Sequence, residues 1–197
     1  MLSDLLYSLK ETEFFFNLFG YISFRSGLSL VTSFFIVIIL MPYWIRFQKS
    51  IFPSGQPIRN DGPDTHYHKK GTPTLGGVLI LFSIIISSIL WTSNFSSFNY
   101  ILILTLTLFG LIGLVDDFQK VKLGKGISSK TKFLSQLLAT IIIYLTIKYN
   151  GFDLNKFSIP FLKDVSIELG YLYFLLILLI VVGSTNATNL TDGLDGL

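Results

Sequence analysis

The chain has 197 residues, of which 51% are hydrophobic and only 14% are charged, and its mean hydropathy is +0.64. Soluble domains carry about 25% charged residues, so this composition excludes an ordinary soluble protein and a disordered one, and it indicates an integral membrane protein. The net charge of +3 is too small to indicate a nucleic-acid partner. The absence of cysteine excludes disulfides, iron–sulfur clusters and thiol nucleophiles.

Residues 1–24 are apolar but carry scattered charges, among them Asp4, Glu11 and Glu13. This pattern predicts an interfacial helix, and it fits neither a cleavable signal peptide nor a membrane span. Five later segments are long and apolar enough, or nearly so, to cross a bilayer as helices. They are 26–45, 73–92, 98–115, 133–149 and 169–187. With no internal repeat or linker, we expect one all-α domain over residues 1–197, a polytopic membrane helix bundle.

Lysine and arginine are concentrated in two of the connecting loops. The loops after the first and third predicted spans hold ten of the fifteen basic residues, namely Arg46, Lys49, Arg59, Lys69, Lys70, Lys120, Lys122, Lys125, Lys130 and Lys132. Because cytoplasmic loops carry the excess of basic residues, both loops are expected inside and the N-terminus outside. The segments with acidic and amide side chains after residues 115 and 187 then face the cytoplasm too.

The first basic loop, GQPIRNDGPDTHYHKKGTPTLGG at 55–77, is richer in polar types than a topology signal requires. Threonines and glycines just before a helix can bring hydroxyl and backbone N–H groups to a phosphate. Gly76 and Gly77 are equally well explained by close helix packing. His66 and His68 form an H-x-H pair, which alone does not indicate a metal site.

Asp116 and Asp117 end a stretch from 98 to 115 that has no charge. Two carboxylates about 6 Å apart repel by roughly 2–3 kcal/mol at an effective dielectric constant of 20. A divalent cation would remove that repulsion, and Mg²⁺ usually binds through one or two carboxylates plus substrate phosphates. Neighbouring helical residues point about 100° apart, so one carboxylate can hold metal while the other faces a nucleophile.

The last segment, GSTNATNLTDGLDGL at 183–197, places Asn189, Asp192 and Asp195 at steps of three, which makes one polar stripe on a helix. Its two N-x-T sequons lie on the predicted cytoplasmic side, where glycosylation does not occur. Gly193 and Gly196 are poor helix residues and suggest backbone opened toward a ligand. Carboxylates, an amide, lysines and threonines at one membrane face suit an enzyme that joins a soluble phosphorylated substrate to a lipid.

Three segments in this order resemble the phospho-N-acetylmuramoyl-pentapeptide-transferase family: QPIRNDGPDTHYHKKGTPTLGG, FGLIGLVDDFQK and NATNLTDGLDGL. The resemblance implies transfer of phospho-N-acetylmuramoyl-pentapeptide from UDP-N-acetylmuramoyl-pentapeptide to undecaprenyl phosphate, giving UMP and the first lipid-linked peptidoglycan precursor. It implies Mg²⁺ as cofactor and the bacterial inner membrane as location, with the active site on the cytoplasmic face. A homodimer is compatible with it.

The resemblance also assigns roles to residues. Asp116 and Asp117 match the family's paired aspartates, with Asp117 nearer the metal. Lys69 is a catalytic candidate. The positions expected around the nucleotide sugar and its uridine are Thr74, Lys120, Asn189, Asp192, Gly193, Leu194 and Asp195. We favour direct attack by the lipid phosphate on the β-phosphate, with Asp116 positioning or deprotonating the acceptor. The second pKa of the lipid phosphate is about 6, so it needs little deprotonation. A covalent aspartyl intermediate stays open.

Family members run well beyond residue 197, with a further metal-binding aspartate and a histidine-rich loop. We therefore expect this chain to be an N-terminal portion that is inactive alone. One alternative is a transferase that moves N-acetylglucosamine-1-phosphate from its UDP carrier to the same lipid. A more distant alternative is a transporter, which would carry its charges near mid-span.

Overall fold

A computed structural model of the chain describes residues 2–53, 73, 75–159, 161–162 and 165–191. The chain divides into two compact units, Met1–Ile127 and Ser128–Leu197. The long helices of the first unit are α2 (Ile22–Ile51), α3 (Gly76–Trp91) and α4 (Ser97–Leu123), preceded by α1 (Leu2–Ser8), η1 (Leu9–Glu11) and η2 (Phe14–Gly20). The second unit contains α5 (Ser129–Tyr149), β1 (Lys156–Ser158), β2 (Ser166–Glu168) and α6 (Leu172–Thr191).

The N-terminal segment is folded as short helical pieces, and within the described residues it contains no helix long enough to cross a membrane. Phe19 is buried. Its ring stacks on Trp91 at the end of α3, with ring centroids 6.0 Å apart. An interfacial position for residues 1–24 stays a prediction, because the structure contains no lipid.

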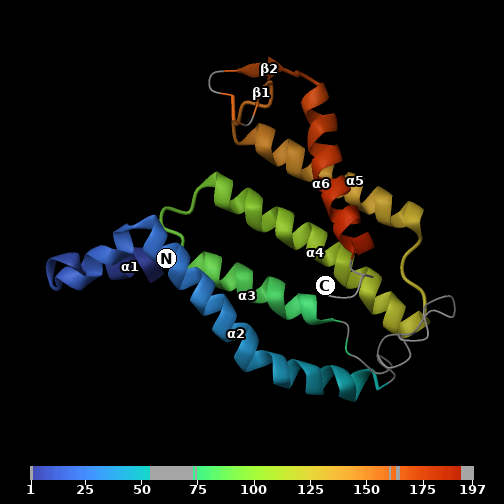
Figure 1. The fold of residues 1–197 in the computed structure, drawn as a ribbon, viewed down its shortest axis with the longest axis horizontal. Helices are drawn as coiled ribbons and strands as arrows, with labels where there is room; N and C mark the ends of the chain where they lie inside the picture. Colours follow the sequence, from blue (N-terminus) through green and yellow to red (C-terminus); the bar gives the residue numbers. More distant parts are fainter. Residues whose placement is uncertain (1, 54–72, 74, 160, 163–164, 192–197) are drawn as a thin grey trace. The chain divides into compact units, whose positions relative to one another are not determined.

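The α2–α3 pair is antiparallel and is held near both ends by indole N–H groups. Trp44 Nε1 donates to the Leu75 carbonyl at 2.9 Å, and Trp91 Nε1 donates to the Thr32 hydroxyl at 2.9 Å. The buried α3 residues Ser83 and Ser87 are small, and such residues allow membrane helices to approach closely. Helix α2 bends along its length and contains Pro42, which lacks the backbone N–H of a regular helix (Figure 1).

Helix α3 lies between α2 and α4 (Figure 1). On α4, Gly110 leaves room for the Leu81 side chain of α3, which a Cβ atom at this position would meet. Near the ends of α2 and α4, the rings of Phe52 and Phe118 meet edge to face, with centroids 5.8 Å apart. That contact places the end of α2 beside the last turns of α4, so the first basic loop starts at the same end of the unit as the paired aspartates.

The second unit pairs α5 with α6. Gln136, which is buried in α5, and Asn186 of α6 exchange amide hydrogen bonds of 2.9 and 3.4 Å. Tyr144 and Phe174 pack edge to face at 5.2 Å. Between the helices, β1 and β2 form an antiparallel hairpin that pairs Phe157 with Ile167. The sequence analysis did not anticipate this hairpin, because each strand has only three residues.

The all-α membrane fold is confirmed. Among the described residues, α2, α4, α5 and residues Leu172–Asn189 of α6 are long and apolar enough to span a membrane, and α3 is a shorter apolar helix. With 16 residues, α3 is about 24 Å long, somewhat less than a hydrocarbon core of about 30 Å. The prediction of a single domain stays a prediction.

Candidate functional site

The paired aspartates lie inside α4 rather than at its end. The apolar stretch stops at Val115, but the helix continues for about two more turns to Leu123. Its last turn carries Lys120 and Lys122, which suit the negative end of the helix dipole. Negative charge in the last turn of a helix is unfavourable, but here α4 continues beyond the aspartates and its last turn carries cations.

Lys120 bridges the two aspartates. Its Nζ lies 2.9 Å from Asp116 Oδ2 and 2.9 Å from Asp117 Oδ1. The spacings i, i+4 and i, i+3 bring all three side chains to one side of the helix. A cation within 3 Å of both carboxylates offsets the repulsion between them, so the protein itself supplies one of the charges that the pair requires.

The two carboxylates differ in their surroundings. The Asp116 side chain is 8% exposed and that of Asp117 is 40% exposed. Asp116 Oδ1 also accepts a hydrogen bond of 3.0 Å from the backbone N–H of Ile127, in the loop that follows α4. Asp116 therefore fastens this loop to the helix, while Asp117 is accessible to a ligand.

Two glycines shape the loop that returns to Asp116. Gly124 ends α4 in the left-handed region, with φ of 72°, and its N–H bonds to the Lys120 carbonyl at 2.9 Å. Gly126 lies against the Asp116 carboxylate, and a Cβ at this position would meet Asp116 Oδ1 and, at 3.1 Å, Lys120 Cε. The sequence analysis missed Gly126 and Ile127. The GKGI segment directly after α4, residues 124–127, was the signal that could have pointed to them.

The described residues contain no group of three or more histidine, cysteine, aspartate or glutamate side chains that could hold a metal ion. Asp117 nevertheless fits a metal ligand of the kind Mg²⁺ accepts, because its carboxylate is accessible and only Oδ1 contacts Lys120. Mg²⁺ commonly takes one or two carboxylates and completes its shell with water and substrate phosphates. Asp116 fits less well, because both of its oxygens are engaged.

The other predicted site residues are divided between the second unit and the part of the chain that is not described. Asn189 lies near the end of α6 and is exposed. It belongs to the other unit, so the structure does not relate it to Asp116. Outside the described residues lie Lys69, Thr74, Asp192, Gly193, Leu194 and Asp195. A residue that the sequence analysis did not assign is Gln136, whose amide holds Asn186 one turn before Asn189.

A family profile described as glycosyl transferase family 4 matches residues 99–197, which is half of the chain. The chain belongs to glycosyl transferase family 4. The matched range contains Asp116, Asp117 and Lys120, together with the loop at Gly126 and all of α5 and α6. The site described above therefore lies within the segment that defines membership of glycosyl transferase family 4.

Several curated relatives share the name phospho-N-acetylmuramoyl-pentapeptide-transferase. The protein of Desulforapulum autotrophicum is 45% identical over 176 residues, which cover 88% of this chain and 48% of the relative. That of Rickettsia prowazekii is 40% identical over 200 residues, covering 100% of the chain and 55% of the relative. That of Thermodesulfovibrio yellowstonii is 41% identical over 177 residues, covering 88% and 49%. The chain thus spans about half the length of the curated relatives it matches.

Proposed function

We propose that this chain forms the N-terminal part of an enzyme that moves phospho-N-acetylmuramoyl-pentapeptide from its UDP carrier to undecaprenyl phosphate. An oxygen of the lipid phosphate forms the new bond to the β-phosphorus, and the bond from that phosphorus to the α-phosphate breaks, which releases UMP. The observation that carries the proposal is the identity of 40–45% to relatives of this name, over 88–100% of the chain.

Asp117 is the candidate for direct contact with the phosphates. Its carboxylate is accessible and lies within about two turns of the end of α4, close to Lys120. Mg²⁺, when bound, would neutralise charge that spreads over the phosphate oxygens during transfer. Asp117 would contribute one ligand to this ion. Lys120 Nζ lies 2.9 Å from Asp117 Oδ1. If a metal ion were bound to Asp117, the Lys120 ammonium could instead contact a phosphate oxygen.

Asp116 is better suited to positioning than to accepting a proton. It is buried, and its oxygens are held by Lys120 and by the Ile127 N–H. These contacts fix where Lys120 and the loop at Gly126 stand relative to Asp117. Such positioning is valuable for phosphoryl transfer, which depends on alignment and charge placement. The assignments of Lys69, Thr74, Asn189, Asp192 and the 193–195 segment to nucleotide and sugar binding stay predictions.

The alternatives are not favoured. The relatives described above share one name, and it is the muramoyl-pentapeptide one rather than that of an N-acetylglucosamine-1-phosphate transferase. A transporter would be expected to place charges near mid-span. On α4, Asp116 and Asp117 instead lie within about two turns of the helix end.

For the location we propose the bacterial inner membrane, with the Asp116–Asp117 end of the first unit in the cytoplasm and the N-terminus outside. The absence of cysteine allows a direct test. Ser97 begins α4 and Ser50 lies near the end of α2, and both are exposed. An impermeant thiol reagent should label Ser97→Cys in intact spheroplasts and Ser50→Cys only after permeabilisation. The reverse pattern would invert the proposed orientation.

A homodimer is a further prediction, to be tested by the mass of the purified particle.

The activity is best tested in a full-length setting. Residues 1–197 should replace the matching segment of the Rickettsia prowazekii relative, which aligns with the whole chain. The chimera should transfer radiolabel from UDP-N-acetylmuramoyl-pentapeptide into a lipid-soluble product in the presence of undecaprenyl phosphate and Mg²⁺. UDP-N-acetylglucosamine is the matched donor control.

The chimera with Asp117→Asn provides the negative control. Transfer from the muramoyl donor alone supports the proposal. A well-folded chimera that uses UDP-N-acetylglucosamine instead, or neither donor, would contradict it.

A further inference from the structure

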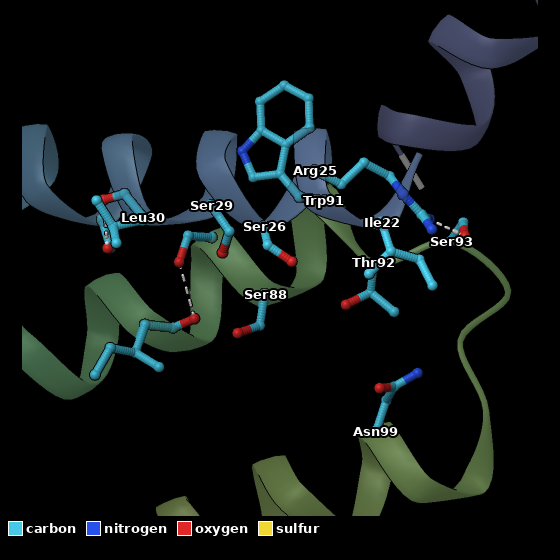
Figure 2. A pocket seen from close by; sticks show the side chains of 13 residues that line it. Ile22, Arg25, Ser26, Ser29, Leu30, Ser88, Trp91, Thr92, Ser93 and Asn99 are labelled. Atoms are coloured by element: carbon cyan, nitrogen blue, oxygen red, sulfur yellow. Dashed lines mark hydrogen bonds between the residues drawn. The ribbon is translucent and has the colours of Figure 1, made fainter. Parts of the chain in front are cut away.

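A groove opens at the end of the first unit opposite to the aspartates. It has a volume of about 520 Å³ and lies between the start of α2, the end of α3 and the start of α4 (Figure 2). Asn99, which lines it, is 17 residues before Asp116 on α4, so about 26 Å of helix separates the two places. The groove is therefore distinct from the proposed active site.

Arg25 is the only cation among the described residues that line the groove, and none of these is acidic. Its guanidinium donates a hydrogen bond to the Ser93 hydroxyl, as Figure 2 shows. Nε is buried and has no hydrogen-bond partner among the described residues. A guanidinium has five N–H donors, and a neutral hydroxyl satisfies only a small part of this capacity. The charge itself has no counter-ion in the described part of the chain.

The neighbouring helix ends do not supply the missing negative charge. Arg25 lies in the first turn of α2, where the helix dipole amounts to roughly half a positive elementary charge. Helix α3 ends near it at Trp91 and contributes a comparable negative partial charge, while the start of α4 adds a second positive one. The helix ends together do not neutralise Arg25, so its full charge is left for a ligand to balance.

Hydroxyl groups surround the same opening. Besides Ser93, the groove is lined by Ser26, Ser88 and Thr92 (Figure 2). No hydrogen bond engages their side chains within the described part of the structure. Hydroxyl and guanidinium donors around one opening match the oxygens of a phosphate, which accepts several hydrogen bonds and pairs bidentately with arginine.

The groove continues along α2 from Arg25 toward the middle of the helix. Leu30 and Ile84 line this part together with Ser29, Ser33 and Ser87, and Ser33 is 11 residues, or about 16 Å, along α2 from Ile22. Ile22 and Leu30 are among the most exposed apolar side chains of α2, so an acyl chain can lie against them at the edge of the groove. A phosphate beside Arg25 and an acyl chain along these two side chains together describe a phospholipid.

We propose that this groove, here called the Arg25 groove, binds the phosphate headgroup of an anionic phospholipid at the membrane surface opposite to the aspartates. The phosphate pairs with Arg25 and accepts hydrogen bonds from the surrounding hydroxyls, while one acyl chain follows Leu30. A zwitterionic lipid offers the same phosphate, but its ammonium group adds a positive charge beside Arg25. The site therefore prefers phosphatidylglycerol to phosphatidylcholine.

Trp91 provides a reporter, because it lines the groove and the chain has only two tryptophans. In the Trp44→Phe background, Trp91 fluorescence should be measured in phosphatidylcholine vesicles with increasing fractions of brominated phosphatidylglycerol or brominated phosphatidylcholine. We expect quenching at a several-fold lower fraction of the anionic lipid. Arg25→Gln should abolish this preference. Arg46→Gln, which removes a charge from the other end of α2, should leave it intact.

A measurement without a variant guards against misfolding of Arg25→Gln. Raising the salt from about 0.01 M to about 1 M shortens the Debye length from about 30 Å to about 3 Å, and should weaken the preference of the unaltered groove. Equal quenching by the two lipids, or a preference that survives Arg25→Gln in folded protein, would overturn the proposal. An Arg25-dependent response to inorganic phosphate in lipid-free detergent, without any preference for the anionic lipid, would overturn the lipid assignment.

Discussion

The two ends of the first unit differ in how their charged side chains are neutralised. In the last turns of α4, Asp116 and Asp117 share the cation Lys120, and Asp116 is also bound by the Ile127 N–H. At the start of α2, Arg25 has a hydroxyl partner and a groove beside it, with no carboxylate among the described residues. At the aspartate end, Lys120 and a backbone N–H neutralise Asp116, and the Asp117 carboxylate stays accessible. At the other end, no carboxylate among the described residues neutralises the charge of Arg25.

This difference separates positioning from ligand binding. A buried charge that is fully engaged by the protein is costly to disturb, and it holds neighbouring groups in place. A charge that is accessible or unmatched has binding capacity left for a ligand. By this criterion Asp116 belongs to the support of the site, whereas Asp117 and Arg25 face ligands.

Loss of either aspartate should have the largest effect. In the full-length chimera, Asp117→Asn and Asp116→Asn should each lower turnover by about 10²–10³-fold, the range seen when one electrostatic contact to a transition state is removed. The two should differ in hydrogen exchange. Asp116→Asn weakens the acceptor of the Ile127 N–H and should speed exchange there, while Asp117→Asn should not. Near-native turnover of Asp117→Asn at saturating Mg²⁺ would remove that residue from the site.

Gly126→Ala tests whether the aspartate end depends on its loop. The added Cβ would meet the Asp116 carboxylate and Lys120 Cε, so the loop and the aspartate cannot both stay where they are. A displacement of about 1 Å can lower turnover by about 10²-fold. The control is Gly113→Ala on α4, where the Cβ meets nothing within 4 Å. If both variants kept full turnover, contact between the loop and Asp116 would be irrelevant to catalysis.

Lys120→Met removes the cation that contacts both aspartates. We expect turnover to fall by up to about 10²-fold, since two adjacent carboxylates about 6 Å apart then repel by roughly 2–3 kcal/mol at an effective dielectric constant of 20. Part of the loss should be recovered by raising Mg²⁺. Lys122→Met is the control, because this lysine is in the same last turn but contacts the Phe118 ring instead. Equal losses in the two variants would show that only the local positive charge matters.

The smallest effect is expected in the second unit, where the matched groups are neutral. Gln136→Leu removes the amide pair with Asn186 and should lower the free energy of unfolding by about 0.6–1.7 kcal/mol, as for other hydrogen bonds between membrane helices. Reversible unfolding in mixed micelles measures this change. Combination with Asn186→Leu completes a double-mutant cycle. Strictly additive changes would mean that the pair does not couple α5 to α6.

Much of the fold could be predicted because hydropathy is local. Long runs without charge, such as 98–115, must place their backbone in helices when they lie in lipid. The helix boundaries were less predictable, because a helix can continue past the apolar run when its last turn carries lysine. The hairpin at β1 and β2 was missed because three-residue strands have no periodicity to detect.

The sequence by itself determined the class of protein and the adjacency of Asp116 and Asp117, because composition and neighbouring positions are properties of the chain in one dimension. The sequence analysis placed Lys120 in the loop after the third span. Lys120 reaches both aspartates because α4 continues to Leu123, where steps of three and four share a helix face. Only the tertiary structure decided which carboxylate is buried. That choice depends on the rotation of α4 and on a loop that brings the Ile127 N–H back to Asp116 from 11 residues away. The same holds for Arg25, whose lack of a counter-ion among the residues that the structure describes follows from which side chains α3 and α4 bring to it.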